Sequence, residues 1–205
     1  ALKDIIGSPP DKLVLVAMHH PFYTYGSHGG FYTLRQHIFP LTDASKNLYI
    51  PLPVIGSIYP LSRSWFGNIQ DRQHPQYKNL IERVEAVLKN HPNVVVASGH
   101  DHNLQLLQHD SIRYIVSGSA AKSNPVKKGK YSLFAKNENG VAVMEISSDR
   151  SVSVKFYSVN SSDLTQPLYS KELPHISSPS ADNGMATDSS FPDSVTVAAS
   201  KEFKA

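Results

Sequence analysis

The sequence predicts a mixed α/β fold, in which a strand–helix–strand unit is followed by a meander of antiparallel strands. Two continuous apolar runs, residues 13–18 and 94–98, are typical of strands that are buried on both faces of a sheet. Between them, the apolar residues of segment 77–90 recur at spacings of three and four, which predicts an amphipathic helix. After residue 102, short apolar segments alternate with turn residues, and this pattern predicts antiparallel strands.

The first half of the chain contains a long irregular segment. Residues 1–11 are expected to be a helix end that runs into a double-proline turn, and Pro21 ends the first strand. Residues 22–30 form a loop rich in glycine and aromatic residues. Residues 31–75 have weak periodicity and several prolines, so we expect a long insertion with short helices. Such an insertion is either a lid or wall that faces a substrate, or a segment that packs on the body of the domain.

The second half is expected to hold the antiparallel strands and a tail. Alternation in residues 152–156 indicates a strand with one exposed face. After residue 160 the pattern is lost, and residues 177–190 have the composition of a linker. We therefore expect a domain over residues 1–160, and a linker and tail over residues 161–205 that lead to another domain. The predicted antiparallel strands are residues 104–108, 112–117, 131–135, 141–146 and 152–159.

Composition excludes several classes of function. The chain has 205 residues, 40% of them hydrophobic, which suffices for one domain with a sizeable core and a tail. Its formal net charge of +3 gives no reason to expect nucleic-acid binding. The absence of cysteine excludes disulfides and a cysteine nucleophile, and no apolar run approaches the roughly 20 residues of a membrane-spanning helix. Since the sequence starts without an initiator methionine or a signal peptide, we expect Ala1 to be a cut or processed end.

The motif Gly99-His100-Asp101-His102 directly follows the second predicted strand. A strand that ends in glycine presents the two imidazoles from a stiff support, and imidazole is a ligand of zinc, iron and similar metals. Asp101 adds acidity without having to be a ligand. Two surface histidines on a loop are the plain alternative, but the context of strand, glycine, His-x-His and a further strand favours metal binding.

The first predicted strand also ends in histidines, at His19 and His20. If the two strands are parallel neighbours, their carboxyl ends meet at one edge of the sheet, where the ligands of α/β proteins gather. We therefore expect His19 to lie near His100, and His20 to face away or to support a ligand. His28, in the glycine-rich loop, is expected either to contact an anionic substrate or protonate a leaving group, or to be a solvated loop residue.

These motifs resemble the C-terminal half of the calcineurin-like metallophosphoesterases, and most closely the purple acid phosphatase branch. The similarity is carried by Val-Ala-Met-His-His-Pro at residues 16–21 and Gly-His-Asp-His at residues 99–102. It covers roughly residues 12–159, where the first strand, the helix and the later strands follow in the order that this family has.

The resemblance implies the C-terminal half of a four-layer α/β/β/α sandwich and a dinuclear metal centre. The centre would hold two divalent or mixed-valence metal ions (Fe, Zn or Mn) and hydrolyse phosphate esters. His19 and His100 would bind one metal and His102 the other. A histidine at the place of His28 would contact the substrate phosphate and act in catalysis.

The first half of this family carries motifs that are missing here. The chain has no Asp-x-His, no Gly-Asp and no Gly-Asn-His, and its Gly67-Asn68 pair is followed by Ile69. Three histidines cannot hold two metals about 3.5–4 Å apart without a bridging carboxylate. Either the chain is a fragment, or another chain supplies the missing ligands. We favour the fragment, and expect these residues to supply only the C-terminal histidine ligands and to be inactive alone.

Other functions compete with this interpretation. No Gly-x-Ser-x-Gly is present, and the residues after His102 do not continue the His-x-His-x-Asp-His motif of metallo-β-lactamase-like hydrolases. A non-enzymatic alternative is a degenerate phosphoesterase domain that acts as a binding or outer-membrane assembly module. The tail loosely resembles the junction that joins a phosphoesterase domain to an outer-membrane β-barrel in some bacteria, which implies an extracytoplasmic location in the periplasm or at the outer membrane.

Overall fold

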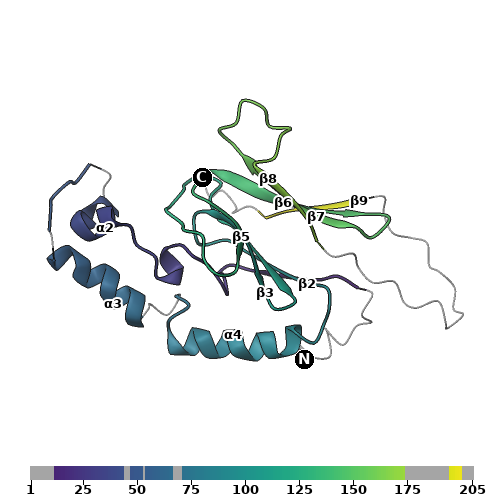
Figure 1. Cartoon of the computed structure of the whole chain (residues 1–205), viewed down its shortest axis with the longest axis horizontal. Helices are drawn as coiled ribbons and strands as arrows, with labels where there is room; N and C mark the ends of the chain where they lie inside the picture. Colours follow the sequence, from purple (N-terminus) through teal and green to yellow (C-terminus); the bar gives the residue numbers. More distant parts are fainter. Residues whose placement is uncertain (1–11, 44–46, 53, 67–70, 174–193, 200–205) are drawn as a thin grey trace, which may run out of the picture.

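The computed structural model of this chain forms three layers, with helix α4 (Pro75–Leu88) against one face of a mixed sheet and a second sheet against the other (Figure 1). This order matches the α/β/β part of the expected sandwich, and the fourth layer stays a prediction. None of the described helices is long and apolar enough to cross a membrane. The expected helix end and the expected linker lie outside the described residues. The structure describes residues 12–43, 47–52, 54–66, 71–173 and 194–199.

The first sheet contains both strands that the apolar runs predict. Its strands are β1 (Val14–Met18), β2 (Val94–Ser98), β3 (Leu104–His109), β4 (Ile112–Ser117) and β5 (Ser132–Lys136). As expected, β1 and β2 are parallel neighbours, and their register runs from Val14 opposite Val94 to Met18 opposite Ser98. β4 lies parallel to β2 on the other side, and β3 is antiparallel to β4 and β5. The order across the sheet is therefore β1-β2-β4-β3-β5.

The prediction of one meander is wrong, because the later strands divide between two sheets. The second sheet is antiparallel and has the order β8-β7-β6-β9, so that only β6, β7 and β8 form a meander. In the first sheet, β5 pairs with β3 and not with β4. The physical reason is burial: most positions of β3 and β4 are buried, whereas burial alternates along β6 and β7. The strands of the second sheet are β6 (Gly140–Ser147), β7 (Val152–Ser158), β8 (Tyr169–Leu173) and β9 (Ser194–Ala199).

Two of these strands lie in the segment that the sequence predicts to be a patternless tail. β8 pairs with β7, and β9 pairs with β6, so each forms one edge of the second sheet. The sequence Tyr-Ser-Lys-Glu-Leu of β8 gives little strand signal, since most of this edge strand is exposed and few apolar residues are needed. The structure thus places two edge strands within residues 161–205, and the domain boundary at residue 160 stays a prediction.

Two apolar cores hold the three layers together. The larger core lies between the sheets and includes Leu106 from the first sheet and Phe156 from the second, both fully buried. The smaller core lies between the first sheet and α4, where Leu88 of the helix packs with Val96 and Tyr114 of the strands. Since β2 contributes to both cores, its carboxyl end is fixed from both faces of the sheet.

Helix α4 confirms the predicted helix, with both ends two residues earlier than expected. Pro75 occupies the first helical turn, where its fixed φ favours the helix and its missing N–H costs no hydrogen bond. The helix buries Ile81 and Leu88 against the sheet. The strand β2 then follows after a short turn, as in an α/β unit.

The predicted insertion contains four short helical segments, which we call the helical lobe (residues 34–66). Thr33 caps its first helix through a reciprocal capping box with Gln36. The segments of the lobe contact mainly one another, and Figure 1 shows α2 and α3 at one end of the molecule, away from both sheets. The four segments are α2 (Leu34–Ile38), η2 (Pro40–Asp43), η3 (Ile55–Ser57) and α3 (Ile58–Phe66).

We expect the protein to lose stability between about pH 10 and pH 12. Burial, and then the nearby Glu85 carboxylate, raise the pKa of Tyr23 from its ordinary value to about 12, although the Arg72 guanidinium opposes this shift. Because folding disfavours the phenolate, Tyr23 contributes stability that is complete below about pH 10 and is lost as the pH rises through 12. Urea unfolding across this pH range measures the loss.

The matched variants are Tyr23→Phe and Tyr49→Phe. Tyr23→Phe removes the ionisable group from the buried site, so its free energy of unfolding should fall less steeply above about pH 10. Tyr49 is exposed, and Tyr49→Phe should keep the steeper wild-type dependence. If the free energy of unfolding of all three proteins had the same pH dependence, the contribution assigned to Tyr23 would be contradicted.

Candidate metal centre

The parallel pair β1–β2 brings two predicted ligands to one edge of the sheet. The last paired residues are Met18 and Ser98, and the backbone N–H of Gly99 donates to the carbonyl of His19 over 3.1 Å. His19 and His100 therefore leave the sheet side by side. His100 has a positive φ of 60°, a conformation in which non-glycine residues are uncommon and which often marks a functional site.

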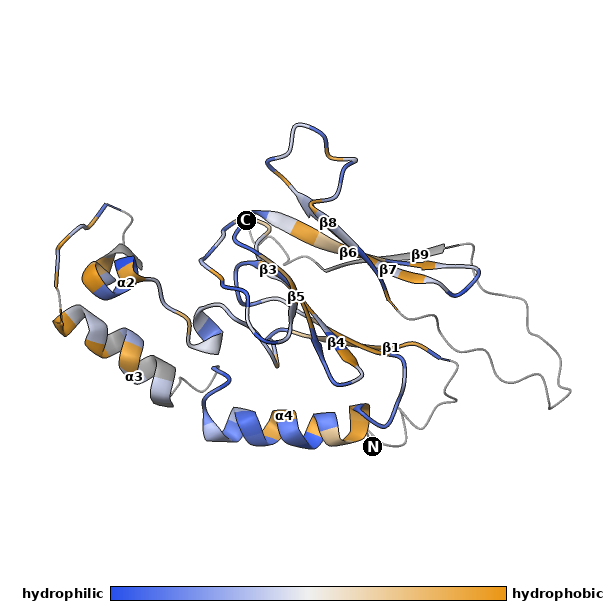
Figure 2. Cartoon of the chain, in the orientation of Figure 1, coloured by the Kyte–Doolittle hydropathy of each residue, from blue (hydrophilic) through white to orange (hydrophobic). Residues whose placement is uncertain are grey.

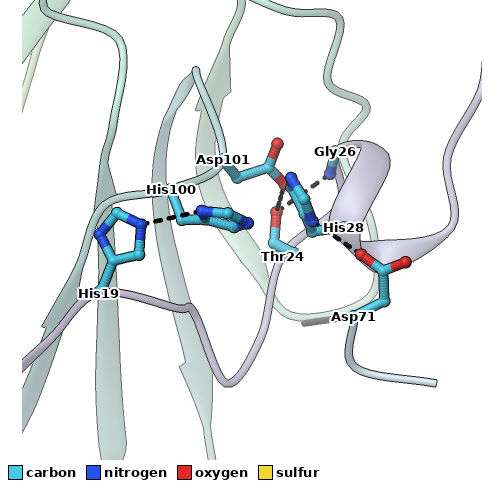
Figure 3. A network of polar contacts seen from close by, with 7 residues as sticks. All are labelled: His19, Thr24, Gly26, His28, Asp71, His100 and Asp101. Atoms are coloured by element: carbon cyan, nitrogen blue, oxygen red, sulfur yellow. Dashed lines mark hydrogen bonds and ion pairs between the residues drawn. The ribbon is translucent and has the colours of Figure 1, made fainter. Parts of the chain in front are cut away.

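Three imidazoles meet at this edge. His19 Nε2 and His100 Nδ1 are 3.0 Å apart, and Figure 3 shows the two rings facing each other. The ring of His20 lies 4.2 Å from the ring of His100, measured between centroids. One nitrogen from each of the three histidines lies within 4.8 Å of the others. We call His19, His20 and His100 the histidine cluster.

His20 does not face away from the site, which is one of its two predicted placements, but lies in the histidine cluster. His19 and His20 follow the last residue of β1, so the alternation that separates neighbouring side chains in a strand no longer applies. The hydroxyl of Tyr77 in α4 donates to the His20 carbonyl over 2.9 Å and holds this bend in place. The histidine doublet directly after a buried strand is the signal that would have identified the pair.

The histidine cluster could hold a metal ion. Two nitrogens bound to one tetrahedral zinc at about 2.0–2.1 Å lie roughly 3.3 Å apart, and the His19 and His100 nitrogens are somewhat closer, at 3.0 Å. Nε2 of His20 and Nε2 of His100 are buried and have no hydrogen-bond partner among the described residues. Burial and the neighbouring histidines lower the pKa of His100 to about 3, so the ring is neutral and its lone pair is available.

His102, the predicted ligand of a second metal, is not a member of the histidine cluster. The side-chain amide of Asn124 donates to its Nδ1 over 3.4 Å, and the backbone N–H of Asn124 donates to its carbonyl over 2.6 Å. His100 therefore lies in the histidine cluster, whereas His102 lies beside Asn124. The role of His102 as a metal ligand stays a prediction.

His28, the predicted catalytic residue, lies beside the histidine cluster and is paired with a buried carboxylate. It sits in the turn η1 (Ser27–Gly29), and its ring centroid is 4.1 Å from that of His100. Its Nδ1 lies 2.7 Å from Oδ1 of Asp71, a residue that is almost fully buried (Figure 3). Sequence reasoning missed Asp71, which is 43 residues away from His28 and has no local motif.

Asp101 joins the two loops that carry the histidines. Its side chain is fully buried and accepts a hydrogen bond from the hydroxyl of Thr24. The same Thr24 oxygen accepts from the backbone N–H of Gly26 over 3.1 Å and from the Gln105 amide over 2.7 Å. A Cβ atom at Gly26 would lie 2.5 Å from a carboxylate oxygen of Asp101, so only glycine fits there. This network fixes the loop of His28 against the loop of His100.

Comparison with known proteins gives distant structural matches, each over about half of this chain. No protein family and no curated protein sequence matches the chain. GAP50 of Plasmodium, described as the anchor in the inner membrane complex, is 24% identical over 48% of this chain, with a TM-score of 0.39. An uncharacterized protein of Streptococcus pneumoniae, described as a predicted phosphoesterase, is 19% identical over 49% of this chain, with a TM-score of 0.31. The matched parts span 30% and 49% of those two chains.

We expect Asp101→Ala and Thr24→Val each to lower the free energy of unfolding by about 2 kcal/mol, because each leaves a buried polar partner unsatisfied. Since both act on one hydrogen bond, the double variant should cost less than the sum of the single variants. Urea unfolding measures all three, with Glu172→Ala on exposed β8 as the control. If the losses in free energy of unfolding from the two substitutions were additive, the hydrogen bond between Thr24 and Asp101 would be contradicted.

Proposed function

We propose that this chain supplies histidine ligands to a centre that hydrolyses phosphoric esters with the aid of metal ions. The observation that carries the proposal is the histidine cluster at the carboxyl ends of β1 and β2. A catalytic ion needs neutral imidazole ligands on stiff elements, and both strands are fixed by the cores on their two faces.

The chemistry of the site divides between the ion and the side chains. A divalent cation held by His19, His20 and His100 would neutralise phosphate oxygens and lower the pKa of a bound water. Of the expected metals Fe, Zn and Mn, imidazole ligands suit Fe and Zn better than Mn. The low pKa of His100 keeps this ligand neutral at physiological pH.

His28 is the residue that we assign to the substrate. Asp71 holds Nδ1 of His28, and this fixes the ring beside the histidine cluster. A histidine in this position hydrogen-bonds the charge that develops on the phosphate, or protonates the departing alkoxide. Asp71 acts through His28 as a positioning residue, because its carboxylate orients the imidazole.

A second metal would need ligands beyond the histidine cluster. We propose His102 as one of them. A two-metal centre also needs a bridging carboxylate, and the Asp-x-His, Gly-Asp and Gly-Asn-His motifs that would supply such ligands are absent from the 205 residues. These residues alone should therefore hydrolyse phosphate esters very slowly or not at all.

The alternative function is a degenerate phosphoesterase domain that serves as a binding or outer-membrane assembly module. One observation favours this alternative. Among the described residues, the histidine cluster includes no carboxylate of the kind that bridges two metals. The expected extracytoplasmic location and the link to an outer-membrane barrel belong to this alternative as much as to the enzyme. Hydrolysis by the full-length gene product separates the two functions.

We expect His100→Ala to abolish hydrolysis of 4-nitrophenyl phosphate by the metal-loaded full-length protein, because the substitution removes a ligand. His28→Ala should keep the metal and lower kcat by about 100-fold, the usual contribution of a general acid. His37→Ala, in the helical lobe, is the matched control and should keep full activity. Unchanged hydrolysis in His100→Ala would contradict the site, and no hydrolysis by the metal-loaded wild type would favour the binding module.

A further inference from the structure

The helical lobe exposes most of the large apolar side chains that the described surface of the protein presents. Among the residues whose exposure the structure describes, twelve large hydrophobic residues are exposed, and nine of them lie between Leu34 and Trp65. Val54 is 83% exposed, and Leu34 and Trp65 are each 75% exposed. Single exposed apolar residues are normal on soluble proteins, but a concentration of this kind marks a surface that is covered by something else.

Helix α3 shows this most clearly. Ile58, Leu61 and Trp65 are spaced by three and four residues and so lie on one face of the helix. In a surface helix such a stripe normally packs on the core. Here all three side chains are exposed, so the apolar face of α3 has no cover from the described part of the chain.

The lobe is a built structure and not a loose loop. The N–H of Leu52 donates to the Ile38 carbonyl over 2.8 Å, and His37 Nδ1 lies 3.2 Å from the Ser57 hydroxyl. A Cβ atom at Gly56 would lie 2.6 Å from the carbonyl of His37, so α2 and η3 pack closely. In Figure 2 apolar colour recurs along α2, α3 and the segment between them, at one end of the molecule. The lobe thus presents its apolar side chains from a defined scaffold.

The charges of the lobe indicate the kind of partner. Its sequence has three cations, Arg35, Lys46 and Arg63, and one carboxylate, Asp43. The Arg35 guanidinium lies 5.0 Å from the centre of the Tyr49 ring, and both side chains are exposed. Apolar side chains, a tryptophan, a tyrosine and an excess of cations are the composition of elements that lie in the interface of an anionic membrane.

We propose that the helical lobe docks on an anionic phospholipid surface. The exposed apolar side chains of α3 and of the segment before it enter the boundary between headgroups and acyl chains, and Arg35 of the lobe contacts lipid phosphates. The lobe lies on the membrane and does not span it. Neither the histidine cluster nor its proposed function is needed for this inference.

The experiment uses the tryptophan that the protein already has. Trp65 is the only tryptophan of the chain and lies on the proposed contact face, so its fluorescence reports docking directly. The protein is titrated with vesicles of phosphatidylcholine, with and without phosphatidylglycerol. We expect a blue shift of the emission, quenching by brominated acyl chains, and roughly tenfold tighter binding to the anionic vesicles. Added salt should reduce this preference.

Two variants test the contact face. Val54→Ser with Ile58→Ser removes exposed apolar groups from the lobe, leaves Trp65 in place, and should weaken vesicle binding at least about tenfold. Leu164→Ser is the matched control, because Leu164 is as exposed as Ile58 but lies outside the lobe. This variant should bind vesicles like the wild type.

The outcomes that overturn the proposal are distinct. Absence of a blue shift with both kinds of vesicle excludes a lipid surface. A blue shift without lipid, which grows with protein concentration and accompanies a doubled mass in light scattering, assigns the face to a second copy of the chain. Equal loss of binding in the lobe variant and in Leu164→Ser shows that the lobe is not the contact.

Discussion

The parallel pairing of β1 with β2 is the constraint on which the candidate site depends. Its register ends at Met18 opposite Ser98, and the hydrogen bond from Gly99 to His19 continues the pairing by one step. A shift of one residue would turn the side chains of one strand to the opposite face and separate the histidines. The register is strongly determined, because the residues of β2 are buried in two cores, one on each face of the sheet.

Two further interactions place the remaining groups relative to this pair. The buried Asp101 carboxylate binds Thr24 and so fixes the glycine-rich loop against the loop that follows β2. Asp71 then holds the ring of His28 from the other side. His28 precedes the helical lobe in the sequence, and Asp71 follows it.

The parts of the fold that the sequence predicts are those with a local signal. Continuous apolar runs identify β1 and β2, and the spacing of apolar residues identifies α4 within two residues. Strand order has no such signal: β4 lies between β2 and β3 because of long-range packing. The same holds in the site, where the strand ends predict the approach of His19 to His100. The role of Asp71 could not be predicted, because its partner His28 is 43 residues away in the sequence. The position of His20 could not be predicted either, because it depends on the bend after β1.

The central claim is that His19, His20 and His100 bind one metal ion together. Calorimetric titration of the apo chain with Zn²⁺, with X-ray absorption of the product, measures stoichiometry, affinity and ligand type. We predict one tightly bound ion with imidazole nitrogens as ligands. Removing a residue that only supports a ligand usually lowers metal affinity roughly 10- to 100-fold, and His20→Ala and His100→Ala should each lower it further than that. The His37→Ala control should bind like the wild type. Wild-type affinity in both His20→Ala and His100→Ala would contradict the account.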